Sequence, residues 1–169
     1  ERLASVQARK LTTIRKSHAA TLETARAKMI TSGDIYAPNG TVVGNVYTDF
    51  GVTRKQVAMD LTNAATDILG KQREIVDHIQ DNIMSGETPS EIIALCSPSY
   101  FDAYISQAGV KEAYKFYTST QEPLRNGNWS QFRHGDITLI RYNGKFKDAS
   151  GVSQALIPDG DAYYLPLDT

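Results

Sequence analysis

The residues best suited to chemistry are Cys96, which ends the short apolar run Glu91–Cys96, and Ser97, which follows it. Ser97-Pro98 is typical of a helix start, so the pair would lie on a turn between a strand and a helix, where nucleophiles often occur. Three further polar side chains could be brought there by the fold: Asp102, His134 and Asp136. However, the sequence lacks the G-x-S-x-G nucleophile elbow, and a buried cysteine acts mainly as a small hydrophobic residue. A hydrolase or transferase at this turn remains an alternative, and a structural role for Cys96 is favoured.

Two other features of the sequence resemble metal-binding sites. His78 lies between Asp77 and Asp81, but no further ligands are evident, so a solvated acidic edge is favoured over a metal site. Asp49-Phe50-Gly51 matches the metal-binding D-F-G of protein kinases, yet the glycine-rich loop, strand lysine and H-R-D motif are missing. We therefore nominate no catalytic, cofactor-binding or metal residue.

The composition is that of an ordinary globular domain. The chain has 169 residues, 41% hydrophobic and 22% charged, about one domain's length with a substantial core. Its net charge of −1 argues against a domain whose main task is binding nucleic acid. One cysteine suits a reducing cytoplasm, and no apolar run approaches the roughly 20 residues that span a bilayer. Because the chain begins at Glu1 inside an apparent helix, we expect a fragment of a longer product.

Residues 1–31 are predicted to form one long helix. Mostly apolar side chains recur at helical spacing: Leu3, Val6, Leu11, Ile14, His18, Leu22, Ala25 and Met29. Such a helix would be about 45 Å long, more than twice the usual length. It is either an amphipathic helix lying on its own domain, or one that packs along a sheet and presents its charged side to neighbouring subunits. Gly33 would end it.

A hairpin is predicted next, turning at Pro38-Asn39-Gly40. Its second strand would start at Thr41 and run on to Phe50, with a bulge or bend at Gly44. Thr53 then resembles the N-cap of a helix that reaches Met84, either continuous or broken near Gly70.

The second half is predicted to contain most of the strands. Glu91–Cys96 would be buried on both faces, followed by a helix whose inner face carries Tyr100, Phe101, Tyr104 and Ile105. Ile137–Tyr142 alternates like a strand, and Asn143-Gly144 predicts a hairpin with a return strand at Lys145–Lys147. Pro158-Asp159-Gly160 predicts a turn into a last strand at Asp161–Leu165.

This order of elements resembles the lambda-type major capsid proteins of tailed phages, the phage capsid protein E family. The matching features are a long helix, a β excursion ending in D-F-G at residues 49–51, a buried strand with a Ser-Pro helix, R-Y-N-G at 141–144, and I-P-D-G-D-A-Y-Y-L-P at 157–166. Residues 116–131 do not match, and Trp129 or Tyr117 there would serve an interface or a core equally well.

The resemblance implies an α+β chain with the phage-capsid fold: a peripheral segment of the long "spine" helix and β excursion at 1–52, and a central axial segment at 53–169. It implies no enzyme, but a major capsid subunit of a tailed phage or prophage, made in the bacterial cytoplasm and found in the virion. The chain would lack the family's N-terminal arm, extended hairpin loop and last strand.

Its partners would be other copies of itself in pentamers and hexamers, with possible scaffold, decoration or portal proteins, and neither a membrane nor specifically recognised nucleic acid. The alternatives are the enzyme at Cys96-Ser97 and a binding module that uses the long helix.

Overall fold

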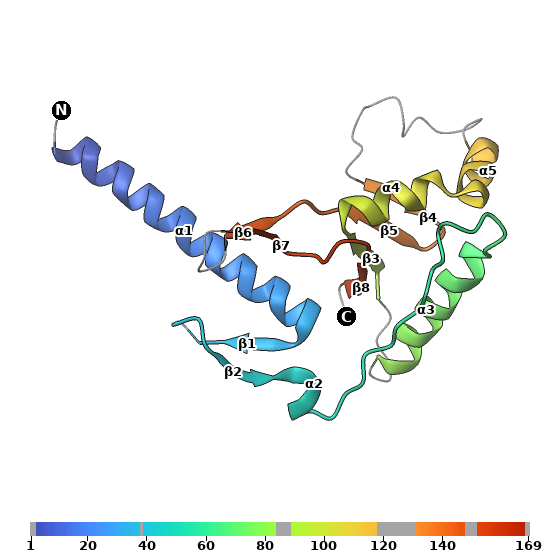
Figure 1. Cartoon of the computed structure of the whole chain (residues 1–169), viewed down its shortest axis with the longest axis horizontal. Coiled ribbons are helices and arrows are strands. Elements are labelled where there is room, and N and C mark those ends of the chain that lie inside the picture. Colours follow the sequence, from blue (N-terminus) through green and yellow to red (C-terminus); the bar gives the residue numbers. More distant parts are fainter. Residues whose placement is uncertain (1–2, 38, 84–88, 118–130, 148–151, 168–169) are drawn as a thin grey trace. The chain divides into compact units, whose positions relative to one another are not determined.

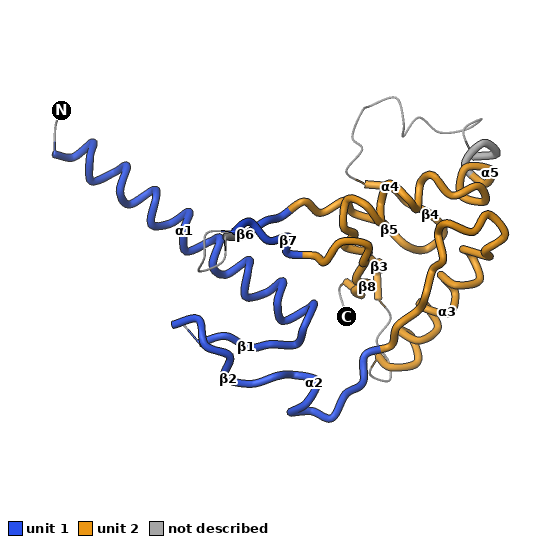
Figure 2. The backbone as a smooth tube through the Cα atoms, in the orientation of Figure 1, with its two compact units in different colours: residues 1–54, 144–156 blue, residues 55–143, 157–169 orange. Residues whose placement is uncertain are grey.

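The computed structural model describes residues 3–37, 39–83, 89–117, 131–147 and 152–167. The chain divides into two compact units, drawn in blue and orange in Figure 2. Unit 1 contains residues 1–54 and 144–156, and unit 2 contains residues 55–143 and 157–169. Helices and strands are both abundant, which confirms the α+β class. Trp129 and the side chain of Tyr117 lie outside the described residues.

The long helix is confirmed as α1 (Leu3–Ser32), the blue helix of Figure 1. It ends where Gly33 adopts a left-handed φ of +79° and donates its N–H to the Met29 carbonyl at 3.0 Å. Only Thr31 is buried along its whole length. α1 is therefore held within unit 1 mainly at its C-terminal end.

A hairpin of β1 (Asp34–Tyr36) and β2 (Val42–Asn45) follows, as predicted. The irregularity expected near Gly44 is present, because Ile35 pairs with Gly44 while Tyr36 pairs with Val42. The predicted continuation of β2 to Phe50 is wrong. Asn45 instead caps the short helix α2 (Val46–Asp49), its side chain accepting the N–H groups of Tyr47 and Thr48. An N-cap side chain satisfies the free N–H groups of a first turn, so the strand stops there.

Unit 1 also contains β6 (Lys145–Lys147) and β7 (Ser153–Ala155), which pair antiparallel. The predicted hairpin at Asn143-Gly144 is therefore wrong, since Lys145–Lys147 does not return along the preceding strand. Lys28 of α1 lies 5.3 Å from the ring centroid of Phe146, a cation–π contact that joins the helix to β6.

Unit 2 begins with residues 55–67, which are not helical, so the helix predicted from Thr53 is wrong over that stretch. Asp60 adopts a φ of +45°, and its carbonyl accepts the N–H of Asn63 and the hydroxyl of Thr66. Short polar side chains that bond to nearby backbone compete with helix formation. The apolar residues of the stretch still serve the core, with Met59 buried and Val57 and Leu61 packed against it.

The helix itself is α3 (Ile68–Asn82), capped by Asp67. Gly70 does not break it but lies in its first turn and donates its N–H to the Asp67 carboxylate at 2.9 Å. Its buried residues are Ile68, Gln72 and Ile75.

Four strands form the sheet of unit 2 in the order β4 (Gln131–His134), β5 (Ile137–Arg141), β3 (Glu91–Cys96), β8 (Ala162–Leu167). β3 runs parallel to β5 and antiparallel to β8, while β4 and β5 are antiparallel. β3 alternates between fully and partly buried residues, so only one of its faces is fully buried, not both as predicted. The turn at Pro158-Asp159-Gly160 is confirmed, with Gly160 at a φ of +83°.

The core of unit 2 lies between this sheet and the helices α3, α4 (Pro98–Ser106) and α5 (Ala108–Tyr117). As predicted, α4 directs aromatic side chains inward: Tyr100, Phe101 and Tyr104 are buried and Ile105 packs against them. They meet Ile92, Ala94 and Cys96 of β3 and Ile137 and Leu139 of β5. Figure 1 shows α4 beside these strands.

Candidate functional site

The Cys96 thiol is placed for packing. Its side chain is completely buried and contacts the Ala94 carbonyl at 3.4 Å. Burial raises the pKa of this thiol to about 12, because the charged thiolate would be desolvated. Only the thiolate is a strong nucleophile, so Cys96 is unreactive at neutral pH.

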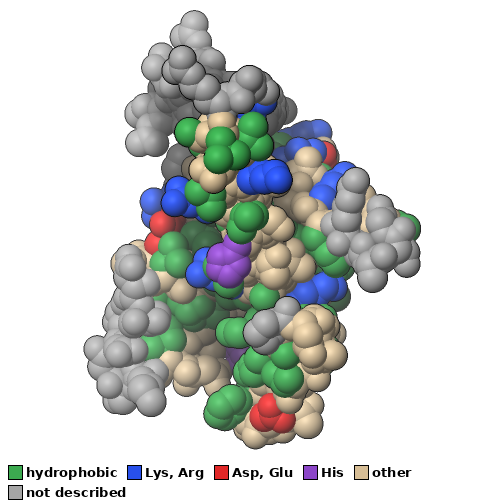
Figure 3. Space-filling view, turned by 90° about the vertical axis from the view of Figure 1, so that its left-hand side faces the viewer, with side chains coloured by type: hydrophobic (Ala, Val, Ile, Leu, Met, Phe, Trp, Pro, Cys, Tyr) green, Lys and Arg blue, Asp and Glu red, His purple; other side chains and the backbone are tan. Residues whose placement is uncertain are grey.

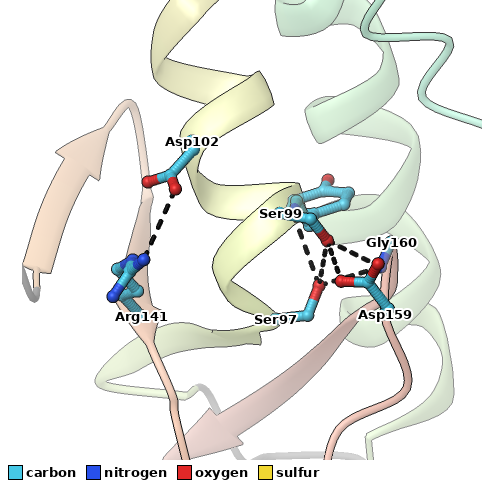
Figure 4. A network of polar contacts seen from close by, with 7 residues as sticks. Ser97, Ser99, Asp102, Arg141, Asp159 and Gly160 are labelled. Atoms are coloured by element: carbon cyan, nitrogen blue, oxygen red, sulfur yellow. Dashed lines mark hydrogen bonds and ion pairs between the residues drawn. The ribbon is translucent and has the colours of Figure 1, made fainter.

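Ser97 is also completely buried and serves as the N-cap of α4. Its Oγ accepts the N–H of Tyr100 at 3.3 Å and of Gly160 at 3.0 Å (Figure 4). The Ser99 hydroxyl donates to the Asp159 carboxylate, so the 3.3 Å contact between the two serines is donated by Ser97. This network fixes the turn before β8 against the start of α4, and the buried Ser97 hydroxyl is not open to a substrate.

The other proposed catalytic residues do not converge on Cys96 and Ser97. Asp102 forms an exposed ion pair with Arg141 at 3.4 Å, also drawn in Figure 4. His134 of β4 lies beside Ile137, the first residue of β5. Cys96 of β3 lies beside Arg141, the last residue of β5. Four residues of strand separate the two ends, about 13 Å at 3.3 Å per residue. The structure therefore does not assemble the enzyme site considered from the sequence.

His134 instead belongs to a buried network that sequence reasoning missed. Gln72 donates to the Tyr104 hydroxyl at 2.6 Å, and that hydroxyl lies 2.7 Å from Nδ1 of His134. A neutral imidazole can take part in this contact either by accepting the hydroxyl proton at Nδ1 or by donating its own. Burial lowers the pKa of His134, which favours the neutral imidazole. Because the three residues come from α3, α4 and β4, the network fastens both helices to the sheet. A glutamine within the apolar spacing of α3 was its only sequence signal.

The remaining polar motifs have local roles. No group of three or more possible metal ligands occurs within the described residues. His78 contacts the Asn82 side chain, and Asp77 and Asp81 are exposed. Asp49 of the D-F-G accepts the Asn45 N–H at 3.1 Å, which supports the start of α2.

The most unusual surface is that of α1. Large apolar side chains on this helix are exposed over residues 3–29, with exposed fractions of 37% to 74%: Leu3, Val6, Leu11, Ile14, Leu22 and Met29. Leu11, Ile14, Leu22 and Met29 share one side of the helix by their spacing. Within the described residues, no helix is long and apolar enough to cross a membrane. Exposed apolar side chains gathered on one side of a helix commonly mark a contact surface.

Comparisons with known proteins identify the family of the chain. The family model of phage major capsid protein E matches residues 1–169. The chain is 36% identical, over 98% of its own length, to the major capsid protein of Pseudomonas phage KPP10. It is 27% identical, over 91% of its length, to the major capsid protein of Salmonella phage Felix O1.

The chain spans about half the length of these curated relatives, 51% and 46% respectively. The resemblance drawn from the order of elements is thus confirmed: the chain belongs to the phage major capsid protein E family.

Proposed function

We propose that this chain is part of the structural head subunit of a tailed phage or prophage, which self-assembles into an icosahedral shell around DNA. The observation that carries the proposal is the family match, which covers every residue from 1 to 169. Both relatives are named for the same structural role. The protein would be made in the bacterial cytoplasm and reside in the virion.

Assembly is the mechanism. Many identical copies would associate through modest interfaces, and the number of contacts in a closed shell would supply the stability that one contact lacks. The exposed apolar side of α1 supports this mechanism, because removing it from water is favourable by about 25 cal/mol per Å². The partners are first of all other copies, in pentamers and hexamers, and then scaffold, decoration or portal proteins. No specific recognition of nucleic acid is proposed.

The finer fold assignment follows the family. α1 would be the spine helix, and residues 1–52 would belong to the peripheral domain with the hairpin β1–β2. Residues 53–169 would form the axial domain, which surrounds the symmetry axis of each capsomer. The grouping of β6 and β7 with α1 in unit 1 supports assigning residues 144–156 to the peripheral part as well.

Electron microscopy of the full-length protein, expressed in a bacterium with its neighbouring genes, tests the proposal. We expect closed shells or capsomer rings, and a dispersed monomer under these conditions would contradict it. Residues 1–169 alone should sediment as a monomer or weak oligomer, and a stable hexamer from this segment would contradict that part of the proposal.

A matched pair of variants links shell formation to α1. Ile14→Asp places a charge among the exposed apolar side chains and should abolish shells. Thr13→Asp makes a comparable change about 100° around the helix and should leave shells intact. Equal effects of the two variants would argue against the apolar side of α1 as an interface.

A further inference from the structure

The two units carry opposite charge, although the chain as a whole is nearly neutral. Unit 1 contains ten Lys and Arg against five Asp and Glu, a net charge of +5. Unit 2 contains eight Lys and Arg against fourteen Asp and Glu, a net charge of −6. The overall value of −1 thus hides a strong separation of charge along one chain.

The positive charge of unit 1 is concentrated on α1. This helix carries six Lys and Arg and a single acidic residue, Glu23. Lys10, Arg15 and Lys16 lie in its first half, where every described residue is exposed. By their helical spacing, Lys10 and Arg15 flank the apolar side that contains Leu11 and Ile14. In the view from the N-terminal end of α1, basic side chains (blue) lie beside hydrophobic ones (green), and acidic ones (red) are few (Figure 3).

An apolar strip with charged flanks has the composition of a protein interface, in which an apolar centre is surrounded by a polar rim. The basic rim requires an acidic partner, since like charges across an interface are repelled. Unit 2 provides acidic residues on the outer side of α3. Asp77 and Asp81 are exposed and share one side of the helix, opposite the side that buries Gln72 and Ile75. Glu74 lies on the same side but forms an ion pair with Lys55 at 2.9 Å, and the basic Lys71 and Arg73 lie nearer the start of α3.

We propose that α1 of one copy docks against the acidic surface of unit 2 on a neighbouring copy, with the exposed side of α3 as its principal contact. This inference rests on the proposed function and names the surfaces through which copies meet. Unlike patches on two identical chains form a heterologous contact, which closes into a ring when the rotation between copies allows it. Rings of five and six copies are the units from which an icosahedral shell is built.

Charge reversal in the full-length protein tests the proposal, with shell yield measured by sedimentation and electron microscopy. The first variant carries Lys10→Glu, Arg15→Glu and Lys16→Glu in α1, and the second carries Asp77→Lys and Asp81→Lys in α3. We expect each variant alone to lose shell yield at least tenfold. The combined variant should recover to within a few-fold of wild type because opposite charges again face each other. Circular dichroism checks that all variants remain folded.

Asp136→Lys is the matched control, because Asp136 is an exposed acidic residue of unit 2 outside α3. Combined with the α1 variant, it should not restore shells. Three outcomes would overturn the docking proposal: an α1 variant that assembles normally, a combined variant no better than the α1 variant alone, or α1-variant shells that form normally but lack DNA. The last outcome would assign α1 to nucleic acid phosphates. Wild-type protein that forms no shells would instead refute the proposed function itself, and the inference with it.

Discussion

The two units differ in the interactions that stabilise each of them internally. The hydrophobic core cluster lies entirely in unit 2, where three helices cover one side of a four-stranded sheet. Unit 1 has a 30-residue helix with one buried residue, two small hairpins and a positive charge. Burial of apolar surface is the main driving force for folding, so unit 2 is stabilised internally. Unit 1 instead leaves large apolar side chains of α1 exposed. Under the proposed function, unit 2 would therefore supply the stability of the chain and unit 1 its contacts with other copies.

The largest expected effect is the loss of stability caused by a mutation in the core of unit 2, compared with a mutation of an exposed apolar residue in unit 1. Phe101→Ala should destabilise unit 2 by about 3–5 kcal/mol, because it leaves a cavity at a side chain that is 1% exposed. Leu11→Ala in α1 should change the stability of the unassembled protein by less than about 0.5 kcal/mol, since Leu11 is 56% exposed. Urea denaturation followed by circular dichroism measures both. Similar losses for the two variants would remove the contrast between the units.

One glycine from each unit tests whether the two units respond independently to a local change. Gly33 and Gly160 both have positive φ, so alanine at either adds about 1–2 kcal/mol of backbone strain. At Gly33, a Cβ would also clash with the Tyr47 ring, whereas nothing lies within 4 Å of a Cβ at Gly160. Gly33→Ala should therefore raise the rate of trypsin cleavage after Arg54 in unit 1 several-fold. Gly160→Ala should leave that rate unchanged and lower only the urea midpoint of unit 2. Faster cleavage in both variants would show that the units are not independent.

Acidification should weaken unit 2 selectively. Burial lowers the pKa of His134 below its ordinary value of 6.5, so the unfolded chain binds a proton more readily than the folded one. The stabilising contribution of the neutral imidazole is complete above about pH 6.5 and is lost as the pH falls below it. Melting curves at pH 7.5 and 5.0 should show a loss that His134→Gln reduces. The same substitution at the exposed His78 is the control, and an equal reduction there would contradict the assignment.

The smallest effect is expected at the surface of unit 2. The ion pair of Asp102 and Arg141 is exposed and 3.4 Å long, so Asp102→Asn should change the stability by less than about 0.5 kcal/mol. A loss above 2 kcal/mol in urea denaturation would show that this pair has a larger role than its exposure indicates.

The sequence predicted elements whose signals are local. The strand β3, the Ser97-Pro98 start of α4 and the left-handed end of α1 at Gly33 depend on neighbouring residues alone, and all three are present. Apolar spacing also predicted the inner side of α4.

The sequence-based predictions failed where strand pairing between distant segments, or hydrogen bonds from side chains to the backbone, determined the structure. Asn143-Gly144 is a strong hairpin signal, but β5 already has β4 on one side and β3 on the other, so no edge remains for β6. Periodic apolar residues after Thr53 predicted a helix. The stretch is instead a turn in which the Asp60 carbonyl accepts the Asn63 N–H and the Thr66 hydroxyl. The enzyme alternative failed for the same reason, because only the strand register shows that His134 and Cys96 lie at opposite ends of the sheet.

Hydrogen exchange measured on the full-length protein, first as dispersed subunits and then as assembled shells, tests the central claim most directly. In dispersed subunits, amides of α1 should exchange orders of magnitude faster than those of β3, because α1 has few buried contacts. Assembly should slow exchange in α1 strongly and leave β3 almost unchanged. Protection of α1 equal to that of β3 before assembly, or no change in α1 upon assembly, would contradict the division between an internally stabilised unit and one completed by its neighbours.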